Sequence, residues 1–144
     1  MGINSSFDIS TSGINAERMH MELIASNLAN INSTKTADGG DYHRKIAVYS
    51  ENEVPFSEFL EKEQMKKAGT PGGVNLEVMD DSSPMQRVYN PGHPDADEKG
   101  YVAMPNVSMA KEMADLVYTS KMYEANITVF NATKKMVQDT LQLQ

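Results

Sequence analysis

Residues 109–141 read MAKEMADLVYTSKMYEANITVFNATKKMVQDTL, and this stretch decides the fold. Every third and fourth residue, taken alternately from Met109, gives ten positions, and eight of them are apolar. This is the spacing of a heptad seam, sustained here over more than four heptads. The ten positions are Met109, Met113, Leu116, Ser120, Tyr123, Ile127, Phe130, Lys134, Val137 and Leu141. The pattern predicts a helix over residues 109–141, about 50 Å long.

The N-terminal end carries a second apolar stripe of helical period. One row of this stripe repeats every seven residues and consists of Phe7, Ile14, Met21 and Leu28. Ile24 and Ile31 occupy the companion row, which Ser10 and Glu17 interrupt further upstream. We expect a helix over residues 5–30, about 40 Å long.

Two such helices laid together would form a coiled-coil-like stalk. Further apolar residues flank the two seams, namely Met19, Val117, Met122, Val129 and Met136. A two-helix stalk cannot bury all of this surface, so the remainder needs another chain, or the helices fray until one arrives. The alternative is an ordinary helical hairpin that packs on the middle of its own chain.

Between the stripes, Gly, Pro and acidic residues break the chain into short segments with too little apolar content for a large core. Alternating side chains predict strands over residues 42–49 and 74–79, with residues 85–89 as the hairpin partner of the second. A short helix is expected over residues 56–67 and an extended piece over residues 101–104. Asn106 or Ser108 is the expected cap of the long helix that follows.

The expected fold class is therefore α+β, with long N- and C-terminal helices and a small β-rich middle unit. The expected divisions are residues 1–36, 37–104 and 105–144.

Charge is unevenly distributed along the 144 residues, which carry a net charge of −7. Residues 1–37 hold two basic and three acidic groups, residues 38–100 hold seven and thirteen, and residues 101–144 hold four and four. Nearly neutral ends and an acidic middle fit a protein whose ends are buried in an assembly. No basic patch is present to neutralise phosphates, which argues against nucleic acid as a partner.

No catalytic, cofactor or metal site is expected. Cysteine is absent, and the three histidines are scattered without ligand spacing. Residues 95–100 begin like a calcium loop, but Lys99 stands at the fifth position and Asn106 replaces the bidentate Glu of the twelfth, so we interpret them as an acidic turn. No apolar run is long enough to span a membrane, and the first twenty residues lack the pattern of a cleaved signal peptide.

Asparagine side chains recur beside both apolar stripes, at Asn27, Asn30 and Asn126. In a buried interface, amides lower stability but fix the register between helices. We therefore expect an assembly interface that combines apolar and amide side chains: Phe7, Ile14, Met21, Ile24, Asn27, Leu28, Asn30, Met113, Leu116, Tyr123, Asn126, Ile127, Phe130, Val137 and Leu141.

Two segments also carry a family resemblance. The stretch SNLANINST, residues 26–34, resembles the N-terminal signature of bacterial flagellar rod and hook proteins. The run YNPGHPDADEKGYV, residues 89–102, is similar to the rod proteins of the proximal part of the basal body, as are the PNV, EMADL and YEAN segments that follow it.

The resemblance implies a structural subunit without enzymatic activity or cofactor. Such a subunit would be exported unfolded by the flagellar type III apparatus without cleavage, and would join the periplasmic rod by packing its terminal helices against copies of itself and other rod proteins. No membrane insertion is implied. The alternatives are another axial protein of the superfamily, a helical-hairpin adaptor that binds a partner helix, and a small metal-dependent enzyme.

Overall fold

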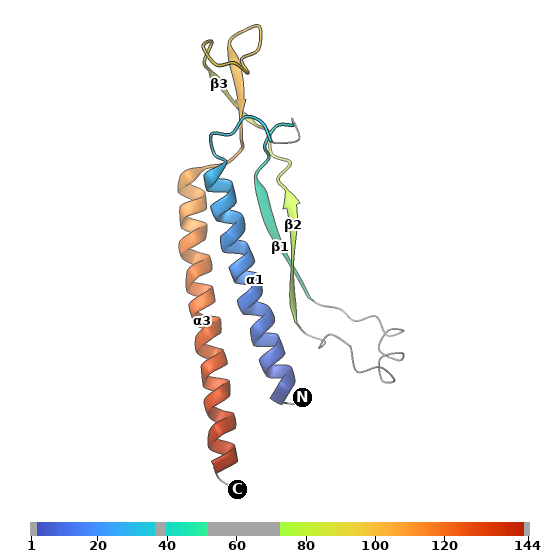
Figure 1. The fold of residues 1–144 in the computed structure, drawn as a ribbon, viewed down its shortest axis with the longest axis vertical. Coiled ribbons are helices and arrows are strands. Elements are labelled where there is room, and N and C mark those ends of the chain that lie inside the picture. The colour runs from blue at the N-terminus through green and yellow to red at the C-terminus, as the bar shows by residue number, and fades with distance from the viewer. Residues whose placement is uncertain (1–2, 37–39, 52–72, 143–144) are drawn as a thin grey trace, which may run out of the picture. The chain divides into compact units, whose positions relative to one another are not determined.

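The computed structural model describes residues 3–36, 40–51 and 73–142. The chain begins with the long helix α1 (Ile3–Ala29), continues through four strands and ends with the long helix α3 (Met109–Gln142) (Figure 1). The strands are β1 (Lys45–Glu51), β2 (Val74–Asp80), β3 (Gln86–Tyr89) and β4 (Tyr101–Met104). This order confirms the predicted α+β class with long terminal helices and a small β-rich region between them. The expected helix over residues 56–67 lies outside the described residues.

Local chemistry explains where each helix starts or stops. α1 stops at Ala29, where the backbone N–H and the side-chain Nδ2 of Asn30 both donate to the carbonyl of Ser26, at 3.1 and 2.9 Å. α3 starts after Ser108, whose carbonyl accepts from the N–H of Glu112 at 2.9 Å, as expected of a residue in the N-cap position. Asn106, the other expected cap, uses its side chain elsewhere.

The strands form two separate two-stranded sheets, β1 with β2 and β3 with β4. β3 and β4 are antiparallel, with Gln86 opposite Met104 and Tyr89 opposite Tyr101. The prediction that residues 85–89 pair with residues 74–79 was wrong, because β2 pairs with β1 and β3 pairs with β4. Gly100 closes the second hairpin with a φ of 79°, a conformation that suits glycine.

The first strand also begins later than predicted, at residue 45 instead of 42. The backbone N–H of Arg44 donates to the side chain of Asn106 at 2.8 Å and is therefore withdrawn from a strand ladder. The side chains of Tyr42 and Arg44 instead serve a polar cluster described below.

The chain forms two compact units. Unit 1 comprises residues 1–20, 48–77 and 119–144, and unit 2 comprises residues 21–47 and 78–118. Within unit 1, the rings of Phe7 and Phe130 meet edge to face with centroids 5.2 Å apart, and Ala16 is buried. Within unit 2, the apolar core consists of Ile24, Tyr42, Val102 and Val107. Neither helix in the described part of the chain combines the length and apolarity needed to cross a membrane.

Candidate functional site: a buried polar node

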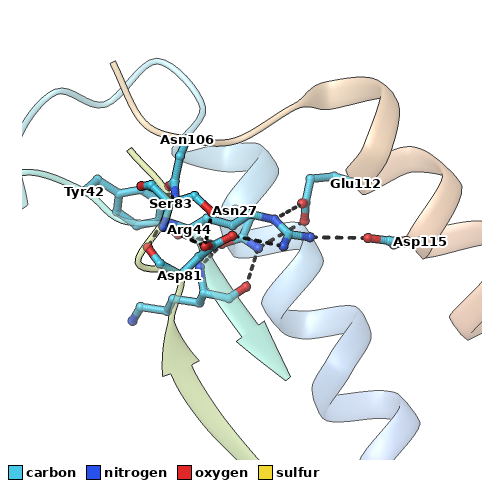
Figure 2. A network of polar contacts seen from close by, with 9 residues as sticks. Asn27, Tyr42, Arg44, Asp81, Ser83, Asn106, Glu112 and Asp115 are labelled. Atoms are coloured by element: carbon cyan, nitrogen blue, oxygen red, sulfur yellow. Dashed lines mark hydrogen bonds and ion pairs between the residues drawn. The ribbon is translucent and has the colours of Figure 1, made fainter. Parts of the chain in front are cut away.

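Asn27 lies at the centre of a buried cluster in unit 2 (Figure 2). Its Nδ2 donates to the Lys45 carbonyl at 2.8 Å and to Glu112 Oε2 at 3.0 Å. Its Oδ1 accepts from the Lys45 N–H at 2.9 Å and from the Tyr42 hydroxyl at 3.1 Å. The amide thus uses both donors and both lone pairs of its oxygen. A carboxylate would lack the two donors, and an apolar side chain would lack both the donors and the acceptor oxygen. This position therefore requires an amide.

Arg44 carries the charge of the same cluster. Its Nε donates to Glu112 Oε1 at 2.6 Å, while its terminal nitrogens lie 3.3 Å from Asp115 and 3.6 Å from Asp81 (Figure 2). The Glu112 side chain is 0% exposed, and that of Arg44 is 11% exposed. A buried carboxylate without a partner is strongly unfavourable, so the guanidinium is essential to the stability of Glu112 here.

Asn106 ties two further backbone segments to the cluster. Its Oδ1 accepts from the Arg44 N–H at 2.8 Å, and its Nδ2 donates to the carbonyls of Asp81 and Ser83, both at 3.2 Å. The hydroxyl and the backbone N–H of Ser83 donate to the Asp81 carboxylate and lower its pKa below 3.8, with a smaller contribution from Arg44.

We call this cluster the polar node: Asn27, Tyr42, Arg44, Asp81, Asn106, Glu112 and Asp115. The node joins α1, the approach to β1, the turn after β2, the approach to α3, and the first turns of α3. No buried side-chain nitrogen or oxygen atom among the described residues lacks a hydrogen-bond partner. Because every polar atom must keep its partner, sliding α1 along α3 by even one residue would break several of these contacts. The node can therefore set the register between the two helices.

The other predicted amides have different surroundings. Asn30 acts locally at the end of α1, where its Oδ1 also accepts from the Ser33 hydroxyl at 3.2 Å. In unit 1, Asn126 lies against Gly13, where a Cβ would be only 3.3 Å from Asn126 Nδ2. Gly13 therefore allows the Asn126 amide to approach α1 closely.

The structure places the predicted interface residues in three groups. Ile24 and Asn27 are buried, while Met113 and Leu141 are 53% and 68% exposed. The others are partly exposed, and they are Phe7, Ile14, Met21, Leu28, Asn30, Leu116, Tyr123, Asn126, Ile127, Phe130 and Val137. Because an assembly interface is covered only in the assembly, these residues remain a prediction.

Sequence reasoning missed most of the polar node. Glu112 and Thr119 are the most buried residues of α3, and they lie seven apart, next to the apolar row. Both are polar, so a search for apolar period passes over them. A usable signal was the need of Asn27 for partners, since an amide beside an apolar seam requires polar groups opposite it.

The acidic loop that resembled a calcium site is held by protein contacts instead. Lys35 Nζ lies 2.8 Å from Asp95, and the Thr34 hydroxyl donates to the same carboxylate at 2.8 Å. These two hydrogen bonds lower the pKa of Asp95, and the bond to Asp95 raises the pKa of Lys35. Asp97 accepts from the backbone N–H groups of Lys99 and Tyr101. Across the described ranges, no three acidic or histidine side chains are grouped as metal ligands.

Comparison with known proteins bears on both terminal helices. Residues 7–35 match the family "Flagella basal body rod protein", and residues 98–143 match "Flagellar basal body rod FlgEFG protein C-terminal". The first match includes Asn27 and the second includes Glu112, so both sides of the central contact of the node fall within these families. The two matches define the class as flagellar rod proteins.

Full-length relatives narrow this class. The chain is 34% identical to the flagellar basal-body rod protein FlgC of Borreliella burgdorferi, over 99% of this chain and 98% of that protein. It is 39% identical to FlgC of Bacillus subtilis, over 96% and 95% of the two chains, and 37% identical to FlgC of Escherichia coli, over 99% and 98%. The chain belongs to the FlgC family, and the resemblance noted in its sequence is confirmed.

Proposed function

We propose that this protein is a structural subunit of the proximal rod of the bacterial flagellum, which transmits motor torque as part of the drive shaft. The observation that carries this proposal is the similarity to FlgC proteins over nearly the whole chain, including both terminal helices. A subunit under torque must keep its helices in register, and the polar node supplies buried, directional contacts suited to that load.

The proposal includes a route and a set of partners. The chain leaves the cytoplasm unfolded through the flagellar type III apparatus, without a cleaved signal peptide, and assembles in the periplasm. Its partners are other rod proteins and copies of itself, which pack against its terminal helices. The apolar side chains that α3 leaves exposed, including Met113, Val129 and Met136, support such packing. It acts without a cofactor and catalyses no reaction.

Deletion of the gene for this chain, followed by complementation, tests the proposal. We expect the deletion strain to secrete no filament, to lack complete rods by electron microscopy, and not to swim, and the wild-type gene to restore all three. Glu112→Ala should be exported but should not restore complete rods, whereas the exposed-site control Glu124→Ala should restore them. Normal rods in the deletion strain would refute the proposed function and favour an adaptor role.

A further inference from the structure

Contacts between α1 and α3 recur at intervals of seven residues along both helices. In unit 2, Asn27 Nδ2 donates to Glu112 Oε2 at 3.0 Å. In unit 1, His20 Nδ1 lies 3.3 Å from the Thr119 hydroxyl oxygen. Each step of seven residues back along α1 is thus matched by a step of seven residues forward along α3. We call these contacts the heptad pairs, and they are Asn27 with Glu112, His20 with Thr119, and Gly13 with Asn126.

The heptad pairs occupy the same place in the sequence pattern of both helices. Each of the six residues directly precedes a position of one of the two predicted apolar rows, as Gly13 precedes Ile14 and Asn126 precedes Ile127. Positions that flank an apolar seam determine partner choice and orientation in coiled coils. Rows at the same flanking position meet when the two helices are antiparallel, so the row on α1 and the row on α3 are matched to each other in that orientation.

The three pairs recognise each other by different chemistry. Asn27 and Glu112 are 1% and 0% exposed and share a hydrogen bond, which requires an amide opposite a carboxylate. Thr119 is 0% exposed, and the His20 nitrogen that it contacts also lies 2.9 Å from the Tyr49 hydroxyl. The third pair is a fit of size, and the pairs are therefore not interchangeable.

Gly13 selects for size because it has no side chain. A Cβ at this position would lie only 3.3 Å from Asn126 Nδ2, which is closer than ordinary van der Waals contact. Within unit 1, a shift of one heptad would bring Asn126 opposite His20, where the imidazole occupies the space that glycine leaves open. The Gly13 pair therefore disfavours the nearest alternative register.

Pairing of identical helices would break the heptad pairs. A second α1 offers Asn27 no Glu112, and a second α3 offers Glu112 no Asn27. Both side chains are buried, and a buried polar group that loses its partner is costly. An unrelated helix with an apolar seam would leave the same groups unsatisfied.

We infer that the heptad pairs specify the partner of α1, so that it packs antiparallel against α3 in one register and not against another α1 or an unrelated apolar helix. This inference rests on the proposed function and deepens it. A rod would bring many helices with apolar seams together, and the heptad pairs name the side chains by which the subunit keeps the correct helix pair among them.

Exchanging the two members of the third pair tests the inference in the full-length protein. Asn is a better helix former than Gly, so any loss in Gly13→Asn comes from its contact with Asn126 and not from helix propensity. We expect the folding equilibrium constant of Gly13→Asn, measured by urea denaturation, to fall about tenfold, since overpacked positions carry costs of this size. Sedimentation should show more self-association than in the wild type, because the mispaired helices expose apolar surface.

Adding Asn126→Gly to Gly13→Asn reverses the fit and should restore both measurements to near the wild-type values. The matched control adds Ala125→Gly instead, which places a glycine at the neighbouring exposed position, and should restore neither. Wild-type behaviour of Gly13→Asn would overturn the inference, as would equal rescue by the control or no rescue by the exchange. If the exchange fails to rescue while the wild-type gene restores rods to the deletion strain, the inference fails and the proposed function stands.

Discussion

The helical segments of the two units are held by different kinds of contact. In unit 2, α1 and α3 meet through buried polar groups, with Asn27 bonded to Glu112 and Glu112 bonded to Arg44. In unit 1, the same two helices meet mainly through partly exposed apolar groups such as Phe7 and Phe130, beside one polar contact at 3.3 Å between Thr119 and His20. Polar contacts allow only one alignment of the two helices, whereas apolar contacts tolerate sliding. The partly exposed apolar side chains also leave surface that another chain can cover. Unit 2 is thus suited to setting the register and unit 1 to joining neighbours.

The largest expected effect comes from removing the buried carboxylate. Glu112→Ala leaves Arg44 without its main partner and Asn27 Nδ2 without one acceptor, so the free energy of unfolding should fall by about 3–5 kcal/mol. Urea denaturation of the dilute protein measures this change. Glu124→Ala breaks an exposed ion pair with Lys121, 2.7 Å apart, and should cost less than about 1 kcal/mol. Equal losses in the two variants would show that the node adds nothing beyond a surface pair.

A somewhat smaller effect is expected at the amide. Asn27→Leu removes four hydrogen bonds and leaves the buried Tyr42 hydroxyl and the backbone of Lys45 without these partners, at a cost of about 2–3 kcal/mol. Helical circular dichroism should be kept, because Leu is the better helix former. Asn30→Leu, the matched control, loses only local contacts at the end of α1 and should cost about 1 kcal/mol. The reverse order of these two losses would contradict the central role of Asn27.

In unit 1 a single contact should matter less to the isolated subunit than to the assembly. Phe130→Ala removes the edge-to-face pair with Phe7 and should lower the free energy of unfolding by about 1–2 kcal/mol, because both rings are partly exposed. Phe130→Asp would place a charge in the seam and should abolish rods and swimming. A motile Phe130→Asp strain would show that this stripe is not an interface.

The smallest expected effect is on the pH dependence of stability, through the carboxylate of Asp95 that bonds Lys35. The pKa of Asp95 is lowered from 3.8 by its bonds to Lys35 and Thr34, so its contribution to stability is present above that pH and is lost as pH falls through the lowered pKa. Asp95→Asn should therefore reduce the melting temperature slightly at about pH 6, and the difference from wild type should shrink towards about pH 2. A constant difference at both pH values would exclude the ion pair as its cause.

The sequence predicted the helices much better than their polar contacts. The heptads from Met109 to Leu141 and the seven-residue repeat from Phe7 report helical period directly, and both helices were found within two residues of their expected ends. The sequence did not predict the node because its partners lie far apart along the chain: Asn27 and Glu112 are separated by 85 positions. Periodicity describes one element at a time and does not specify which elements meet.

Strand pairing failed for a related reason. Alternation predicted strands over residues 74–79 and 85–89, but their closeness in sequence suggested the wrong strand pairing. Each of these strands pairs across a longer connection, β2 with β1 and β3 with β4. The turn at Asp81 is used by the node instead, since its N–H donates to the Arg44 carbonyl at 2.7 Å. Competition by long-range hydrogen bonds therefore overrode the local preference for a hairpin.

Amide hydrogen exchange, resolved along both helices in the dilute monomer, tests the central claim most directly. If the polar node holds the helices in register and unit 1 awaits a neighbour, the amides of residues 24–28 and 113–117 will exchange more slowly than those of residues 8–14 and 128–136. In Asn27→Leu this difference should disappear, while helical content is kept. Uniform exchange along both helices, or slower exchange over residues 128–136 than over residues 113–117, would contradict the account.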